Sequence, residues 1–233
     1  MTISILQVAS VDPTTSATTT ALAFGSNTTA GSTIVAVGFE NFSSISGVAD
    51  SLSNTYTLRQ TAVDSSGNRK LSAFTAPNSA GGACTVTMTL GSTQVIRPLY
   101  LIEVGGATAS SYDTGTHNDQ TSPGTGANAV TSGNATNTNQ PALIVAASMA
   151  LFNTNAPAAG SGFTGQTAAW GNASGSGSGL MVESKRITTT TAVAATFTAA
   201  TNVEHVTLML ILDELVTAAT AGGPVPRTIF IMP

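Results

Sequence analysis

The chain has 233 residues, a formal net charge of −4 and only 8% charged residues, against roughly 25% in an ordinary soluble domain. Its seven Lys and Arg form no cluster, which argues against nucleic acid as a partner because phosphate binding requires clustered cations. No polybasic or amphipathic stretch indicates a membrane surface, and the apolar runs are far shorter than the roughly 20 residues that span a bilayer.

Strands are predicted along the whole chain, and no segment combines a helical period with caps. The clearest is Cys84–Leu90, whose four apolar side chains point one way and three threonines the other. Turn signals at 64–68, 77–82 and 171–179 separate the strands. The pattern predicts an all-β fold with strands at Thr33–Phe39, Asn54–Thr61, Lys70–Thr75, Cys84–Leu90, Val95–Val104, Leu143–Leu151, Leu180–Ile187, Val193–Thr198 and Val203–Leu212.

Three of these strands are almost continuously apolar: Thr33–Phe39, Leu143–Leu151 and Val203–Leu212. A strand of this kind needs cover on both faces. We expect them to be central strands, with a second sheet on one side and loops or a neighbouring subunit on the other.

The two halves of the chain resemble each other at a nearly constant spacing. Positions 34, 60 and 95 correspond to positions 143, 166 and 203, roughly 106 to 109 residues further on. We predict two tandem, related β-sandwich halves of jelly-roll or Greek-key type, either separate or fused into one double sandwich. The expected boundaries are 1–108 for the first half, 109–121 for a polar joining loop, 122–215 for the second half and 216–233 for a C-terminal linker and extended strand.

The C-terminal segment has a composition of its own. A Gly/Pro-rich stretch precedes an apolar strand of Arg227, Thr228, Ile229, Phe230, Ile231 and Met232. A tethered terminal strand suits addition to a sheet edge of another subunit. The alternative is that it folds back on its own domain.

No catalytic constellation is predicted. His117 lies near Asp113 and Asp119, but a third or fourth metal ligand at fixed spacing is missing. Gly160–Gly165 matches the dinucleotide fingerprint letter for letter, yet a Gly/Ser-rich stretch follows where the fingerprint requires a helix. The chain has no Gly-x-Ser-x-Gly nucleophile elbow. We therefore expect no enzymatic activity, no cofactor and no metal.

Two acidic residues on apolar strands, Glu103 and Glu183, stand out in a chain with so little charge. A buried carboxylate needs a partner. We expect each to form a structural ion pair with one of the nearby cations, Arg59, Arg97, Lys185 or Arg186.

A carbohydrate- or host-receptor-binding module is the alternative function. Trp170, the only tryptophan, is closely followed by Asn172 in a loop of small residues, and Tyr112 and Asp113 form a similar pair. An aromatic ring beside amides or carboxylates suits a sugar, so a host-surface glycan is a candidate partner. The competing interpretation is that Trp170 packs in the core.

The N-terminus and the cysteine content bear on where the protein works. No secretory signal follows Met1, and Cys84 has no partner for an intrachain disulfide. The low-charge surface, rich in Thr and Ser, is nevertheless typical of an extracellular protein. A virion protein, assembled in the host cytoplasm and released by lysis, reconciles these observations.

Ile45–Tyr56 reads Ile-Ser-Gly-Val-Ala-Asp-Ser-Leu-Ser-Asn-Thr-Tyr. With Ala30–Val37, Glu183–Arg186 and Ala194–Thr198, it resembles a diffuse family of bacterial and phage surface proteins that carry a Val-x-Asp-Ser-x-Gly-Asn-Thr-Tyr turn followed by paired Thr-rich strands. Ser53 stands where that pattern has Gly. The resemblance implies a jelly-roll-like β-sandwich of a phage tail, fibre or head-decoration component, with other virion proteins and copies of itself as partners and no catalytic residues.

Overall fold

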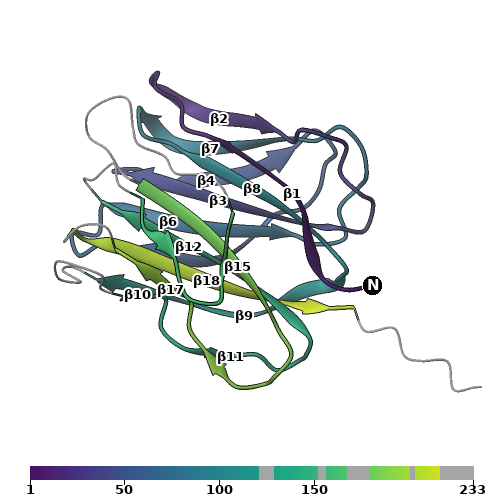
Figure 1. Cartoon of the computed structure of the whole chain (residues 1–233). Coiled ribbons are helices and arrows are strands. Elements are labelled where there is room, and N and C mark those ends of the chain that lie inside the picture. The colour runs from purple at the N-terminus through teal and green to yellow at the C-terminus, as the bar shows by residue number, and fades with distance from the viewer. Residues whose placement is uncertain (121–128, 152–155, 167–178, 200–202, 216–233) are drawn as a thin grey trace, which may run out of the picture.

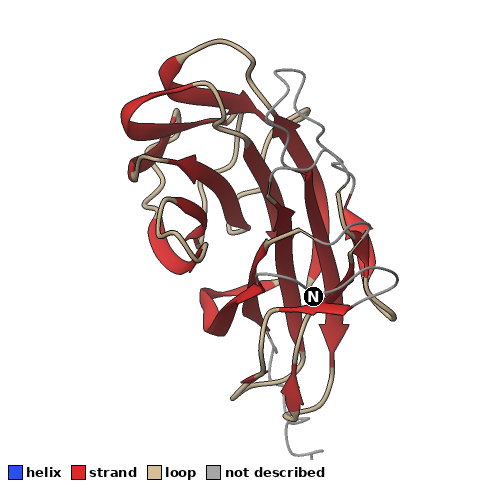
Figure 2. Ribbon diagram, turned by 90° about the vertical axis from the view of Figure 1, so that its left-hand side faces the viewer, coloured by secondary structure: helices blue, strands red, loops and turns tan. Residues whose placement is uncertain are grey.

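The computed structural model describes residues 1–120, 129–151, 156–166, 179–199 and 203–215. Within these ranges the chain consists of strands and loops, without a helix (Figure 2). The predicted all-β class is therefore confirmed for the part of the chain that the structure describes.

The first half of the chain forms two sheets that cover each other. The first inner sheet has the order β1-β8-β3-β6-β5, and the first outer sheet has the order β2-β7-β4. All pairings are antiparallel. The strands are β1 (Ser4–Val11), β2 (Ala17–Ala23), β3 (Thr33–Asn41), β4 (Ile45–Asp50), β5 (Thr57–Val63), β6 (Arg69–Ala76), β7 (Thr85–Gln94) and β8 (Leu99–Gly105).

The second half has a second inner sheet, in the order β9-β18-β12-β15-β14, and a second outer sheet, in the order β10-β17-β13. A short ladder of β11 and β16 lies beside them. The strands are β9 (Ala107–Gln120), β10 (Ala129–Thr131), β11 (Ala135–Thr136), β12 (Ala142–Ala150), β13 (Ala158–Ala159), β14 (Thr164–Gln166), β15 (Gly179–Ile187), β16 (Ala192–Val193), β17 (Thr196–Thr198) and β18 (His205–Glu214).

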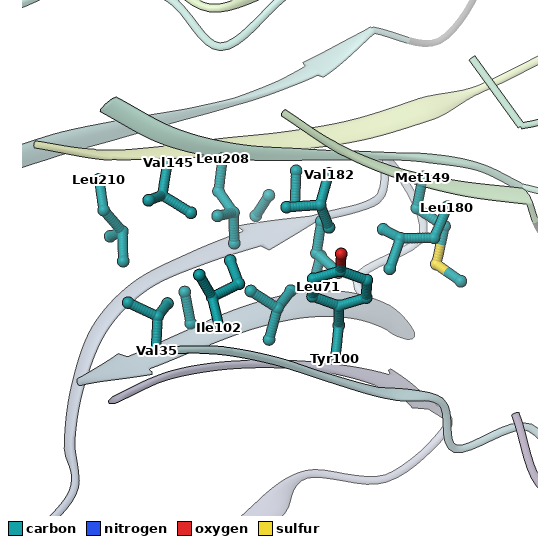
Figure 3. Close-up of a cluster of buried hydrophobic side chains, with 14 of the residues drawn as sticks. Val35, Leu71, Tyr100, Ile102, Val145, Met149, Leu180, Val182, Leu208 and Leu210 are labelled. Atoms are coloured by element: carbon teal, nitrogen blue, oxygen red, sulfur yellow. The ribbon is translucent and has the colours of Figure 1, made fainter. Parts of the chain in front are cut away.

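The sheets are stacked in layers, with the two inner sheets facing each other in the middle (Figure 1). One hydrophobic cluster fills the space between the inner sheets. Figure 3 shows Val145, Leu208 and Leu210 of the second inner sheet pointing toward Val35 and Ile102 of the first. The two halves therefore share a core rather than standing as separate sandwiches.

Each inner sheet is also covered on its other face. Ile34 and Ala36 of β3 pack against Val86 and Met88 of β7 in a second cluster. Ile144 of β12 belongs to a third cluster that contains residues of the second outer sheet. This explains the continuous apolar runs: β3, β12 and β18 are internal strands, as predicted, and β-structure rather than a neighbouring subunit supplies the outer cover.

The alternation predicted for Cys84–Leu90 is confirmed on β7. Val86, Met88 and Leu90 are buried in the second cluster, while the intervening threonines are partly or fully exposed. The expected strand at Val95–Val104 begins only at Leu99. Pro98 precedes it and cannot donate a ladder hydrogen bond; its carbonyl instead accepts from the Phe39 N–H at 3.3 Å.

The expected polar joining loop at 109–121 is wrong, because residues 107–120 form strand β9. This strand pairs with β18 at the edge of the second inner sheet. Its small polar and β-branched residues suit a half-exposed edge strand. The expected strand at Val193–Thr198 is also interrupted at Ala195, between β16 and β17. The Ala195 carbonyl accepts from the Ser132 N–H, and the Ala195 N–H donates to the Ser132 hydroxyl, both at 3.0 Å.

The turn from the first half to the second depends on one glycine. Gly106 lies between β8 and β9 with a φ of 74°, a backbone conformation that is strained for residues other than glycine. A Cβ atom at this position would lie 2.7 Å from the Thr2 carbonyl oxygen. The N-terminal strand and the junction between the halves thus pack tightly together.

Candidate functional site

Asp50 organises the turn of the motif Ile45–Tyr56. Its Oδ1 accepts hydrogen bonds from the backbone N–H groups of Leu52 and Asn54 at 2.9 and 3.0 Å. Its Oδ2 accepts from Asn54 Nδ2 at 2.7 Å and from the Tyr56 hydroxyl at 2.9 Å. Burial raises the pKa of Asp50, but these hydrogen bonds outweigh burial and hold the pKa below its ordinary value. The motif is thus a turn that a carboxylate holds in place.

Ser53 occupies a strained position within this turn. Its φ is 61°, in the left-handed region where a side chain costs about 1 kcal/mol. A φ of this kind usually favours glycine. The hydrogen bonds to Asp50 on either side of Ser53 hold the backbone in this conformation.

Asp64 plays the same part in the loop between β5 and β6. Its Oδ1 accepts from the backbone N–H groups of Asn68 and Arg69 at 2.8 and 2.9 Å. Its Oδ2 accepts from the Ser66 hydroxyl at 2.7 Å and forms an ion pair with Arg69 at 3.3 Å. Both aspartates are thus accounted for by loop structure.

The ion pairs expected for Glu103 and Glu183 are not present among the described residues. The ion pairs of the described part of the chain are Arg69–Asp64 and Arg186–Glu214. Glu103 instead accepts hydrogen bonds from Gln7 Nε2 and from the backbone N–H of Thr29, both at 2.6 Å. The Glu103 carboxylate is therefore stabilised by an amide and a backbone N–H group instead of the expected cation.

Glu183 has fewer partners than Glu103. It is fully buried, and its Oε2 accepts from the backbone N–H of Gly160 at 2.8 Å. Its Oε1 is buried without a hydrogen-bond partner in the described part of the chain. Burial raises the pKa of Glu183 to about 7, although the backbone N–H groups of Gly160 and Thr196 and the charge of Lys185 lower it in part.

The paired residues Tyr112 and Asp113 make separate contacts. Both lie on β9, whose register with β18 shifts at Asp113, between Tyr112 and Thr114. The Tyr112 hydroxyl accepts from Gln60 Nε2 at 3.0 Å, and the Arg59 guanidinium lies 4.8 Å from the ring centroid. Asp113 accepts from the backbone N–H and the hydroxyl of Thr138, both at 2.6 Å. Each residue therefore has a structural role in a different contact.

The remaining candidate residues either lie outside the described residues or form a turn. Trp170, Asn172 and the strand at 227–232 lie outside the described residues. Gly160–Gly165 spans the connection between β13 and β14, where the Phe163 N–H bonds the Gly160 carbonyl at 3.1 Å. The segment thus forms a turn that leads into a strand.

The thiol of Cys84 is buried 3.6 Å from Asp50 Oδ2. Burial, followed by the charge of Asp50, raises the pKa of Cys84 to about 12. Because the thiolate is the nucleophilic form, this thiol is unreactive at neutral pH.

A surface hollow that the sequence did not indicate lies at one end of the first half. It has a volume of about 410 Å³ and is lined by Phe42, Ser43, Ser44, Gly67, Asn68, Lys70, Gly91 and Ser92. Phe42 is 60% exposed and has a φ of 54°. The only hint in the sequence was an aromatic residue in the polar stretch Asn41–Ser44, just beyond an apolar strand.

Hydrogen bonds tie together the three segments around this hollow. The Phe42 N–H donates to the Asn68 carbonyl at 2.8 Å, and the Gly91 N–H donates to the Ser44 carbonyl at 2.9 Å. Lys70 Nζ lies 3.2 Å from the Ser44 hydroxyl. The Arg69 guanidinium lies 5.1 Å from the Phe42 ring centroid and helps to hold the ring.

Comparisons of the chain with protein-family models, with curated proteins and with solved structures found no match. In the described ranges, no three His, Cys, Asp or Glu side chains gather as metal ligands. The same ranges contain no helix with the length and apolar character needed to cross a membrane.

Proposed function

We propose that the chain is a non-enzymatic structural protein of a phage virion, a head-decoration or tail component. It assembles with copies of itself and with other virion proteins. Its low charge supports this proposal, because few charges have to be desolvated when copies pack closely.

The tandem jelly-roll architecture is part of the same proposal. In an eight-stranded jelly roll, the first, eighth, third and sixth strands form one sheet, and the second, seventh, fourth and fifth form the other. The order β1-β8-β3-β6 and the order β2-β7-β4 follow this scheme, with β5 moved beside β6. The second half repeats both orders as β9-β18-β12-β15-β14 and β10-β17-β13, which supports an origin by internal duplication.

The open edge of the first inner sheet carries the assembly proposal. β1 pairs with β8 on one side, and no described strand pairs with its other side. An unpaired edge is a template for strand addition. Leu6 on β1 is 48% exposed and lines a mainly apolar hollow of about 370 Å³, together with Met1, Ala107 and Leu215.

The C-terminal strand is the proposed occupant of this edge in a neighbouring copy. Leu215, the last described residue, lies in the wall of the hollow. Eleven residues lie between it and Arg227, and an extended stretch of that length spans up to roughly 40 Å. We propose that residues 227–232 use this span to add to the β1 edge of an adjacent subunit.

Two variants test this arrangement. Deleting residues 221–233, or replacing Leu6 with Lys at the proposed acceptor edge, is expected to convert an oligomer into a monomer in multi-angle light scattering. Leu58→Lys is the matched control, because Leu58 is 52% exposed on β5 at the opposite edge of the same sheet. Assembly that survives the deletion, or a full chain that stays monomeric at high concentration, would contradict the proposal.

The virion assignment has its own test. Quantitative mass spectrometry of particles purified from the source culture should find this chain in many copies relative to the major shell protein. Its absence from every particle would sink the assignment.

A further inference from the structure

The Phe42 hollow combines an exposed ring with polar groups from three segments far apart in the sequence. Phe42, Ser43 and Ser44 follow β3, Gly67 and Asn68 precede β6, and Gly91 and Ser92 lie on β7. Phe42, Ser44, Gly67, Asn68, Gly91 and Ser92 are all exposed, so the hollow is open to solvent. Its volume of about 410 Å³ lies within the usual range for small-molecule sites, roughly 300–1,000 Å³.

Phe42 is an unusual residue at this position for two independent reasons. Its ring is exposed, although burying an aromatic ring is favourable. Its φ of 54° is also strained for a bulky side chain. The other described non-glycine residues with positive φ are Ser53 and Asn78, both small and polar. A strained, exposed aromatic residue is a reason to look for a ligand.

The polar groups around the ring define the ligand further. The side chains of Asn68, Ser43 and Ser92 offer an amide and two hydroxyl groups. Each already makes one hydrogen bond within the chain, and the two hydroxyl groups, which act there as acceptors, keep their own hydrogens to donate. Lys70 supplies a positive charge, with no carboxylate partner within ion-pair distance in the described chain. Arg69, by contrast, is paired with Asp64.

We propose that the Phe42 hollow binds an acidic sugar residue of a glycan. The apolar C–H face of the sugar packs on the Phe42 ring, and its hydroxyl groups bond to Asn68 and the serines. Its carboxylate meets Lys70 Nζ. This site is distinct from the β1 edge, and the proposal does not depend on the assembly function.

The test uses an array of matched acidic and neutral oligosaccharides, namely trigalacturonate with its methyl ester and sialyllactose with lactose. The full chain is expected to bind at least one acidic probe more strongly than its neutral counterpart. Phe42→Gly should weaken that binding at least tenfold without lowering thermal stability, because glycine removes the backbone strain. Lys70→Gln should abolish the preference for the acidic probe over the neutral one.

Ser53→Gly is the matched control, because it relieves a positive φ elsewhere and should leave binding unchanged. Failure of the wild-type chain to bind any acidic probe at millimolar concentration would overturn the proposal. Unchanged binding by Phe42→Gly would also overturn it. So would a folded Trp170→Ala variant that loses binding while Phe42→Gly retains it.

Discussion

Glu183 carries a buried carboxyl group whose ionisation we expect to oppose folding. Its Oε1 is buried without a hydrogen-bond partner among the described residues, and its Oε2 accepts from the Gly160 N–H. Burial raises its pKa from 4.5 to about 7. Below about pH 4.5 the Glu183 carboxyl is neutral in both the folded and the unfolded chain, so it does not lower the free energy of unfolding relative to a permanently neutral side chain. It reduces stability progressively as the pH rises toward and through 7.

The size of this effect follows from the two pKa values. The difference between 4.5 and about 7 corresponds to roughly 3 kcal/mol of lost stability once the carboxyl is ionised in both the folded and the unfolded chain. Glu183→Gln keeps an acceptor for Gly160 but adds amide donors that need partners, which costs about 1 kcal/mol. We expect a net gain of about 2 kcal/mol at pH 8, which is a rise of about 4–8 °C in Tm.

The assay is urea unfolding followed by circular dichroism at pH 5 and pH 8. The advantage of Glu183→Gln should be large at pH 8 and shrink toward pH 5. Parallel pH dependences for the variant and the wild type, or a variant less stable than the wild type at pH 8, would refute this reasoning.

Glu103→Gln is the matched control, with the opposite expected sign. Glu103 is equally buried on a strand, but its two oxygens accept from Gln7 and Thr29, respectively. An amide can offer only one oxygen to these two donors. The substitution should therefore destabilise the protein by about 1–3 kcal/mol at pH 8, and an increase in stability would contradict our account of both acids.

Three further substitutions test the turns. Ser53→Gly should raise the free energy of unfolding by about 0.5–1 kcal/mol, because glycine removes the strain at a φ of 61°; a lower urea midpoint would contradict this. Asp50→Ala should lower the free energy of unfolding by about 3 kcal/mol or more, because four buried or half-buried donors lose their acceptor. A decrease below about 1 kcal/mol would show that water replaces the carboxylate. Gly106→Ala should lower Tm by several degrees, because the new Cβ atom meets the Thr2 carbonyl at a φ of 74°; an unchanged Tm would mean that β1 shifts freely.

The local pattern predicted much of the fold. Alternation marked β7, and continuous apolar runs correctly marked β3, β12 and β18 as internal strands. The prediction failed where polarity suggested a loop. Strand β9 consists largely of small polar residues, and its pairing with β18 is a long-range interaction that no local pattern in the sequence encodes.

The candidate site was harder to predict. We expected ion pairs for Glu103 and Glu183 because a buried carboxylate is often paired with a cation. In the structure, backbone N–H groups and Gln7 donate hydrogen bonds to these acids instead. Tyr112 and Asp113 were paired because they are adjacent, yet Tyr112 contacts Gln60 whereas Asp113 accepts hydrogen bonds from Thr138. Phe42 drew no attention in the sequence, because only the folded chain shows that its ring is exposed.

The sequence by itself determined the all-β class and the internal strands, because the two-residue period and the apolar runs are local properties of the chain. Only the tertiary structure decided the layer order, the shared core of the two halves and the open edge at β1. It also made the Phe42 hollow, by joining Ser44 to Lys70 and Ser43 to Ser92 through contacts that span 26 and 49 residues. Such contacts depend on how the sheets pack, and sheet packing depends on interactions between residues that are far apart in the sequence.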